Sequence, residues 1–178
     1  MTRYARLKTP LGTLIAIAAG GCLTGLHFEN ARHAPAIAPD WREDPQAAPL
    51  RDCAQQLADY FSGKRSCFDL PLAPQGTPFQ QRVWREITRV PFGETISYAE
   101  LASRAGAPGS ARAAGAATGR NRLAIVVPCH RIVASSGALT GYAGGLARKR
   151  SLLAHEGTGF GDGSPEPSRR TVPEAVPA

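Results

Sequence analysis

Short apolar and polar stretches alternate along residues 3–29, and turn-forming residues interrupt them twice. The interruptions are residues 9–12 (TPLG) and residues 19–21 (AGG). Alternation over a few residues is typical of a half-buried strand, and Gly or Pro between two such runs favours a hairpin turn. The pattern therefore predicts three short strands in a small antiparallel sheet.

A helical spacing replaces this alternation further along the chain. Residues 31–45 are rich in Ala, Pro and charge, so we expect a loop there. Over residues 47–62, apolar side chains then recur every three or four positions, which predicts a helix. Gly63 follows where a C-terminal cap belongs. The recurring residues are Leu50, Cys53, Leu57, Tyr60 and Phe61.

Two further helices are predicted between residues 77 and 106. Thr77 can cap a helix that has Pro78 at its first position and ends at residues 91–93 (PFG). Ser97, with Glu100 three residues later, has the spacing of a capping box at the start of a second, short helix.

A third helix, residues 111–119, consists almost wholly of Ala and Gly and carries Arg112. A short helix, a tight turn, this helix and a Gly-rich hairpin over residues 135–145 form the outline of a winged helix-turn-helix. Small side chains let the helix approach another surface closely. That surface is either a neighbouring helix or the minor groove of DNA, which an arginine can enter. Composition alone does not decide between the two.

These elements predict an α+β protein with three segments. Residues 1–75 form a small antiparallel-sheet and helix domain, and residues 76–157 form a helical winged helix-turn-helix domain. Residues 158–178 are Gly, Pro, Ser and Glu without periodicity, so we expect a disordered tail.

The positive charge of the chain is concentrated in one segment. The 178 residues carry a formal charge of +7, and residues 76–156 contain eleven basic and four acidic residues. Such a segment suits a polyanion such as nucleic acid. The alternative is a set of solvated arginines that reflects only a GC-rich genome.

Apolar runs and cysteines limit the cellular setting. The longest apolar stretch, residues 14–21, is far shorter than the ~20 residues of a membrane-spanning helix. The N-terminus lacks a charged region followed by a cleavage site, so we expect no leader peptide. The four cysteines, Cys22, Cys53, Cys67 and Cys129, show no C-x-x-C pairing, so we expect free thiols in a reducing compartment. We therefore expect a cytoplasmic protein, or a nuclear one in a eukaryote, that makes no membrane contact.

The segment with the most chemical content is residues 125–133 (IVVPCHRIV). A β-branched run leads to Cys129 directly after a proline, and His130 and Arg131 follow. A thiolate is the nucleophilic form of cysteine, and neighbouring positive charge or an imidazole favours it. His130 can reach the thiol only if the backbone turns here or a water bridges the two groups. Taken alone, the dipeptide also fits a buried, inert cysteine beside a structural histidine.

This segment resembles the active-site signature of the 6-O-alkylguanine-DNA alkyltransferases, also called methylated-DNA–protein-cysteine methyltransferases. The resemblance runs from about residue 79 to residue 157. It includes the motifs FGE at 92–94, ISY at 96–98, ARA at 111–113, GY at 141–142, GGL at 144–146 and LLAHEG at 152–157, together with Asn121 and Lys149. In residues 1–75, which the family would make ribonuclease H-like, only TPLG at 9–12 and GLH at 25–27 match.

The resemblance implies a single-use DNA repair enzyme. An alkyl group would pass from guanine oxygen, or from alkylated thymine, to the sulfur of Cys129. His130 would act as a base through a water, with Glu156 orienting its imidazole. Tyr98 would donate a proton or a hydrogen bond to guanine N3, and Asn121 would brace the turn before the cysteine.

The resemblance also implies how alkylated double-stranded DNA is bound by a monomer. The target nucleotide would be flipped out of the stack, and Arg112, with Ala111 and Ala113 beside it, would fill the space. Tyr142 and Ala143 would line the base pocket, and the carbonyls of Cys129 and Ile132 would accept from the guanine amine. The resemblance thus assigns DNA binding to Arg112, Ala111, Ala113 and Tyr98. It assigns binding of the substrate base to Tyr142, Ile132 and Ala143.

The chain departs from the family pattern at two positions. Arg122 follows Asn121 where the family has proline, which adds a possible phosphate contact. Ala143 stands where many members have a serine that donates to guanine oxygen. Cys22 and His27 have the spacing of two zinc ligands of some animal members, but two ligands do not complete the usual four-ligand site, so we expect no metal and no cofactor.

Three other readings remain open. The first is a methylation-responsive DNA-binding regulator that uses the same winged helix-turn-helix. The second is a non-catalytic damage-binding protein, a class in which the reactive cysteine is replaced. The third is an unrelated cysteine hydrolase, for which the chain carries no signature.

Overall fold

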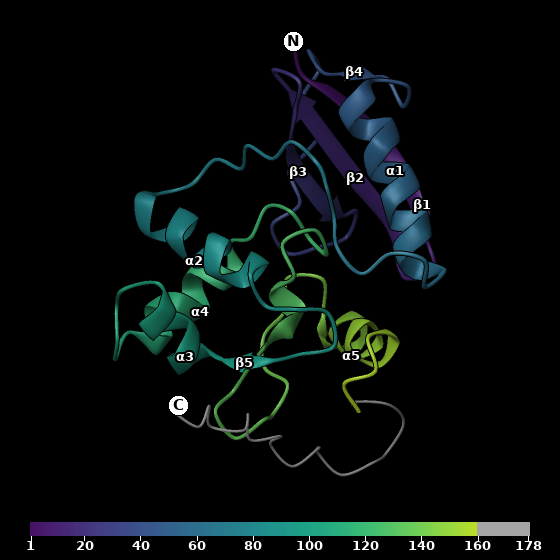
Figure 1. Ribbon diagram of the computed structural model, residues 1–178. Coiled ribbons are helices and arrows are strands. Elements are labelled where there is room, and N and C mark those ends of the chain that lie inside the picture. The colour runs from purple at the N-terminus through teal and green to yellow at the C-terminus, as the bar shows by residue number, and fades with distance from the viewer. Residues whose placement is uncertain (160–178) are drawn as a thin grey trace, which may run out of the picture.

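The computed structural model describes residues 1–159, and its N-terminal part is a four-stranded sheet with one helix packed on it (Figure 1). The strands are β1 (Arg3–Thr9), β2 (Gly12–Ala19), β3 (Cys22–Phe28) and β4 (Arg42–Glu43), in the order β3-β2-β1-β4. The first three are antiparallel, as predicted, and β4 is parallel to β1. The expectation of an uninterrupted loop over 31–45 is therefore wrong at β4. Its two residues are too few to show a period.

Glycines make the second hairpin possible. Gly20 and Gly21 have φ angles of 58° and 80°. A two-residue hairpin turn of this kind needs positive φ at both central residues, which glycine adopts without a steric penalty. The sequence signal at residues 19–21 thus fixes the pairing of β2 with β3.

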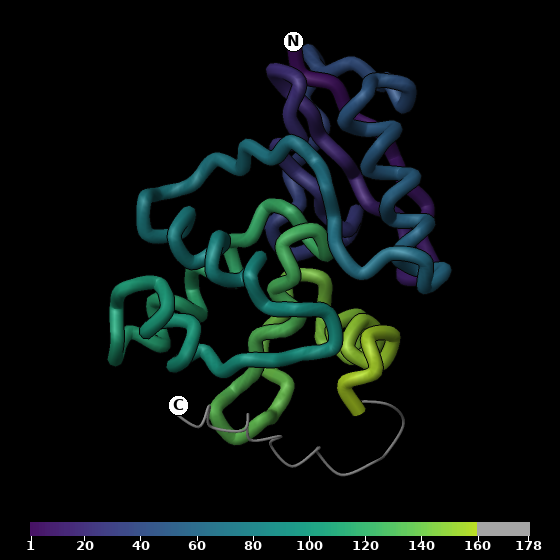
Figure 2. The backbone as a smooth tube through the Cα atoms, in the orientation of Figure 1, coloured from purple at the N-terminus to yellow at the C-terminus, as the bar shows by residue number. Residues whose placement is uncertain are grey.

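The helix predicted over 47–62 is α1 (Ala48–Phe61), which ends before Gly63 at a φ of 76°. Three of its own residues, Leu50, Cys53 and Tyr60, are buried. An extended segment then leads across the molecule to α2 (Pro78–Thr88), as the smooth trace in Figure 2 shows.

The second half is mainly helical. Thr77 and Gln80 form a full capping box at the start of α2. Next come β5 (Ile96–Ser97) and α3 (Tyr98–Arg104), where the Ser97 side chain accepts from the backbone N–H of Glu100. The reverse bond of the predicted capping box is replaced by an ion pair between Glu100 and Arg104.

Helix α4 (Ala111–Gly119) has the predicted bounds and two different faces. Ala114, Ala117 and Thr118 are buried, whereas Arg112, Ala113 and Ala116 are exposed. The two readings of this small-residue helix therefore apply to opposite sides of it. One side packs against the protein and the other is open to a partner.

The last part of the described chain differs most from the sequence expectations. A one-turn 3-10 helix (Cys129–Arg131) precedes β6 (Ile132–Val133), which is parallel to β5. The Gly-rich segment 135–145 forms turns and no strand, so the predicted hairpin is wrong: glycine-rich sequence has few side chains to pack as a strand. Helix α5 (Leu146–His155) follows. The predicted tail lies outside the described residues, apart from its first two.

One hydrophobic core joins both halves of the chain. Leu26 of β3 forms a parallel bridge with Leu123, and backbone bonds of 2.7 and 2.9 Å flank it. Both side chains are fully buried in a cluster that also contains Cys129. Within residues 1–159, no helix has the length and apolar character needed to cross a membrane.

Candidate active site

Cys129 lies at the start of the 3-10 turn, after Pro128. The backbone turns sharply here, because Cys129 N–H donates to the Val127 carbonyl at 2.8 Å and Arg131 N–H donates to the Pro128 carbonyl at 2.9 Å. Cys129 is 6% exposed. The expectation that a proline-stiffened turn presents the cysteine is met, although the residues before it form turns rather than a strand.

Asn121 holds the cysteine from the end of α4. Its Nδ2 donates to the Val127 carbonyl at 2.8 Å and to Cys129 Sγ at 3.1 Å, while its Oδ1 accepts from Leu123 N–H at 2.9 Å. Burial raises the pKa of the Cys129 thiol, and the hydrogen bond from Asn121 and the charge of Lys149 oppose that rise. The sulfur therefore needs a base to become a thiolate near neutral pH.

His130 and Glu156 form a fully buried pair next to the cysteine. The distance between His130 Nε2 and Glu156 Oε1 is 2.8 Å. Burial lowers the pKa of His130, so the ring is neutral at pH 7 and carries its proton on Nε2, facing the carboxylate. Nδ1 is buried and has no hydrogen-bond partner among the described residues. Its lone pair is consequently free to accept a proton.

Glu156 is held ionised by donors from several elements. Arg131 donates twice, from Nε to Oε2 at 2.8 Å and from Nη2 to Oε1 at 2.9 Å. Tyr60 of α1 donates to Oε1 at 2.7 Å, and Gly93 N–H donates to Oε2 at 3.3 Å. Although burial acts in the opposite direction, the hydrogen bonds of His130 and Arg131 hold the pKa of Glu156 well below its usual range.

Tyr98 and Lys149 share a hydrogen-bond acceptor, the Thr140 carbonyl, in the loop between β6 and α5. Tyr98 donates to the Thr140 carbonyl at 3.0 Å, and the Lys149 ammonium donates to the same oxygen at 2.9 Å and to the Ile132 carbonyl at 2.5 Å. Burial lowers the pKa of Lys149 to about 8. The carbonyls of Cys129 and Ile132 thus already accept one hydrogen bond each, from Ile132 N–H and from Lys149, and each keeps a second lone pair.

Tyr142 belongs to the same neighbourhood. Its hydroxyl is buried without a partner among the described residues, and burial together with the charge of Cys129 raises its pKa. A Cβ built on Gly144 would lie 2.8 Å from both the Tyr142 ring and the Phe28 ring, so glycine is needed where this loop passes them. The adjacent Ala143 carbonyl accepts from Arg32 N–H at 3.3 Å.

The two halves of the chain match two domains of one family. Residues 2–74 match the model described as "6-O-methylguanine DNA methyltransferase, ribonuclease-like domain", and residues 78–158 match its "DNA binding domain". The chain belongs to the 6-O-methylguanine DNA methyltransferase family. The family match covers the cysteine, its turn and Glu156 alike.

Individual relatives agree with the family assignment. The chain is 45% identical to the methylated-DNA–protein-cysteine methyltransferase of Mycolicibacterium paratuberculosis, with 88% of this chain and 93% of the relative covered. It is 41% identical to the constitutive enzyme of Bacillus subtilis, with 86% and 93% covered. A crystal structure of Mycobacterium tuberculosis OGT in complex with DNA superposes with a TM-score of 0.81 at 43% identity, covering 89% of this chain and 94% of that one. These names support DNA repair by alkyl transfer and do not support the regulator alternative.

Within this methyltransferase fold, the sequence-predicted residues separate into three places. Cys129, Asn121, His130 and Glu156 are connected directly or through the turn. Tyr98 and Ile132 meet through Lys149, and Tyr142 and Ala143 lie in the loop before α5. Arg112, Ala111 and Ala113 lie together at the start of α4. A Cβ on Gly115 of α4 would lie 3.6 Å from the Tyr98 ring, so Tyr98 packs against this helix.

Sequence reasoning missed the groups that hold Glu156. Tyr60 stood out only as an apolar position of a helix, and its partner is 96 residues away. Arg131 was noted only as a source of charge beside the thiol, yet it is 6% exposed and pairs with Glu156. A usable signal was available for Arg131 alone, since a charge between apolar residues 125–128 and 132–133 implies a buried partner. Within the described residues, no group of three or more His, Cys, Asp or Glu side chains is arranged to hold a metal ion.

Proposed function

We propose that this chain repairs double-stranded DNA by moving an alkyl group from O6 of guanine to Cys129 Sγ, once per molecule. The observation that carries the proposal is the buried sulfur held by Asn121 beside a neutral His130 that Glu156 anchors. O4-alkylthymine is a second substrate of the same chemistry. The thioether product is not converted back to a thiol, because no group in the site activates the sulfur of a thioether as a leaving group.

The proposed reaction uses groups that the fold already orients. His130 Nδ1 takes the thiol proton through one water, and Glu156 stabilises the imidazolium that forms. The Cys129 thiolate then attacks the alkyl carbon, the bond from carbon to guanine oxygen breaks, and its electron pair stays on the base. Tyr98 donates a hydrogen bond to guanine N3 and stabilises the negative charge on the base, which then takes a proton from solvent. For this step, its hydroxyl exchanges the Thr140 carbonyl for the base.

Access to the sulfur requires a flipped nucleotide. We propose that α3 and α4 are the two helices of a winged helix-turn-helix, with the loop 134–145 in the place of the wing. Arg112 enters the duplex and fills the space left by the base, while Ala111 and Ala113 allow close approach to the groove. Exposure of Arg112 and Ala113 on α4 supports this role.

The base pocket is assigned to the loop around Tyr142. Tyr142 and Ala143 form its walls, and the second lone pairs on the carbonyls of Cys129 and Ile132 accept from the guanine amine. Adenine lacks that amine, so this contact favours guanine. Burial of the Tyr142 hydroxyl without a partner supports a place beside a polar base edge.

We further propose that residues 1–75 and 76–157 are two domains of a monomer that works in the cytoplasm on nucleoid DNA. The first domain, ribonuclease H-like in this family, supports the second. The hydrogen bond from Tyr60 to Glu156 supports this role of the first domain, because it lets α1 hold the carboxylate that anchors the catalytic histidine.

A pair of cysteine variants tests the proposal. Cys129→Ala is expected to abolish transfer from alkylated duplex DNA and to keep lesion binding, because the change removes only the nucleophile. Cys67→Ala, at an exposed thiol, is the matched control and is expected to transfer normally. Transfer by Cys129→Ala would refute the proposal, and loss of lesion binding would assign the cysteine a structural role.

A further inference from the structure

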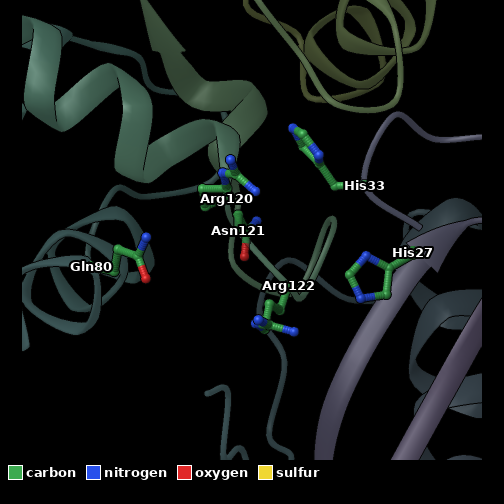
Figure 3. Close-up of a pocket in the computed structure, with 6 residues that line it drawn as sticks. All are labelled: His27, His33, Gln80, Arg120, Asn121 and Arg122. Carbon is green, nitrogen blue, oxygen red and sulfur yellow. The ribbon is translucent and has the colours of Figure 1, made fainter. Parts of the chain in front are cut away.

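A cavity lies between the two halves of the chain, and Cys129 is not among the residues that line it. Its volume is about 330 Å³. Figure 3 shows side chains converging on it from β3, from the loop after it, from α2 and from the segment after α4. The lining residues are His27, His33, Gln80, Arg120, Asn121 and Arg122.

The lining is cationic and has no counter-charge. It contains two arginines and two histidines but no carboxylate. Within residues 1–159, neither Arg120 nor Arg122 forms a side-chain ion pair or hydrogen bond. Burial, with smaller contributions from the charges of Arg122 and His33, lowers the pKa of His27 to about 4, so this ring is neutral near pH 7 and the two arginines carry the positive charge of the cavity. An anion in the cavity would supply the counter-charge that Arg120 and Arg122 lack there.

The cavity also offers neutral donors. Gln80 Oε1 accepts from Thr77 N–H at 3.0 Å, which leaves the amide N–H groups of Gln80 for a ligand. The carbonyl of Ala117, in the last turn of α4, is already satisfied by Trp84 Nε1 at 2.9 Å. The partial negative charge at the C-terminus of α4 is therefore partly neutralised near Arg120, the first residue after the helix that lines the cavity.

The position relative to α4 indicates where an anion would come from. Arg120 comes eight residues after Arg112, which is about 12 Å along a helix at ~1.5 Å per residue. That span is about twice the ~6 Å width of the minor groove, so a duplex that receives Arg112 in its minor groove has the phosphates that flank the groove on the side of Arg120. Asn121 lies in the cavity wall and also donates to Cys129 Sγ, so the cavity is one side chain away from the reacting sulfur.

We propose that this cavity binds a phosphodiester group of DNA, held by Arg120 and Arg122 with Gln80 and His33 around it. The proposal rests on the proposed function and extends the DNA contact from α4 to the seam between the two halves. Both halves line the cavity, so the bound phosphate bridges them.

The test measures how salt weakens binding of a short, unmodified duplex to the full chain. Each phosphate contact contributes about −0.9 to the slope of log K against log salt concentration. The double variant Arg120→Gln, Arg122→Gln is expected to lower the magnitude of that slope by about 1. Arg150→Gln, at an exposed arginine of α5, removes charge elsewhere and is expected to leave the slope within experimental error.

A second measurement identifies the source of the phosphate. Ring resonances of His27 and His33 are expected to shift when the duplex is added and to shift little with the same concentration of inorganic phosphate. An unchanged slope in the double variant, an equal fall in Arg150→Gln, or shifts with inorganic phosphate alone would each overturn the proposal. Transfer from a duplex that carries O6-alkylguanine to the wild-type chain is measured in parallel. Its absence would refute the proposed function, whereas the slope reports on the cavity independently.

Discussion

Tyr60→Phe removes a single hydroxyl that links α1 to the catalytic carboxylate. That hydroxyl donates to Glu156 Oε1 at 2.7 Å, and the ring keeps its contacts with Phe92 and His155. A hydrogen bond to a buried charge contributes about 1.5–3 kcal/mol. Because Oε1 retains His130 and Arg131 as donors, we expect a loss near the lower end, about 1.5–2 kcal/mol. This is roughly a ten- to thirtyfold change in the unfolding equilibrium.

Urea unfolding at pH 7 measures this loss directly. Tyr4→Phe is the matched control, because Tyr4 also donates to a carboxylate, Glu43 Oε2, but at 3.3 Å on the surface. We expect the control to change the free energy of unfolding by no more than about 0.5 kcal/mol. If Tyr60→Phe costs no more than Tyr4→Phe, the hydroxyl does not support Glu156 and the link between the two halves of the chain is not energetic.

The remaining predictions concern DNA binding, pH and the turn beneath Glu156. Arg112→Ala is expected to slow transfer from duplex DNA at least about tenfold more than transfer from the free base, because base flipping costs a few kcal/mol and the free base needs no flipping. Equal losses on the two substrates in single-turnover assays would contradict the role of Arg112. The free energy of unfolding is expected to fall as pH drops from about 7 to 4. The pKa values of His130 and Glu156 both lie below their ordinary values, so the unfolded chain binds more protons than the folded one over this range. A free energy of unfolding that does not change with pH in urea titrations would contradict these shifts. Gly93→Ala is expected to cost about 1–3 kcal/mol, because φ is 79° and the new Cβ would lie 3.0 Å from the Glu156 carbonyl oxygen. Gly106→Ala, at a φ of 77° with open space around it, shows how much of that loss is backbone strain.

Local signals predicted most of the secondary structure. The Gly pair at residues 20–21 set a hairpin, and the cap at Thr77 with Pro78 set the first residue of α2. Both signals act within four residues, so no tertiary contact overrides them. The loop 135–145 was predicted less well, because it is held from outside: Lys149 of α5 donates to the Thr140 carbonyl and Tyr98 of α3 donates to the same oxygen.

The candidate site divides in the same way. The turn at Cys129 and the nearby Asn121 followed from a short motif and its resemblance to a family. The supporting contacts from Tyr60 and Arg131 could not be predicted, since their partner Glu156 becomes a neighbour only when the two halves share one core. Sequence therefore indicated the reacting atoms, and the structure added the groups that set their charge.

Cys129 is proposed as an acceptor that is used once, and label transfer from DNA to protein is the direct test of that role. Duplex DNA carrying methyl-labelled O6-methylguanine is incubated in excess with the full chain, and the label on protein is counted and located by peptide mass spectrometry. We expect at most one equivalent of label per chain, all of it on the peptide that contains Cys129. Repeated turnover, or label on a peptide without Cys129, would contradict it.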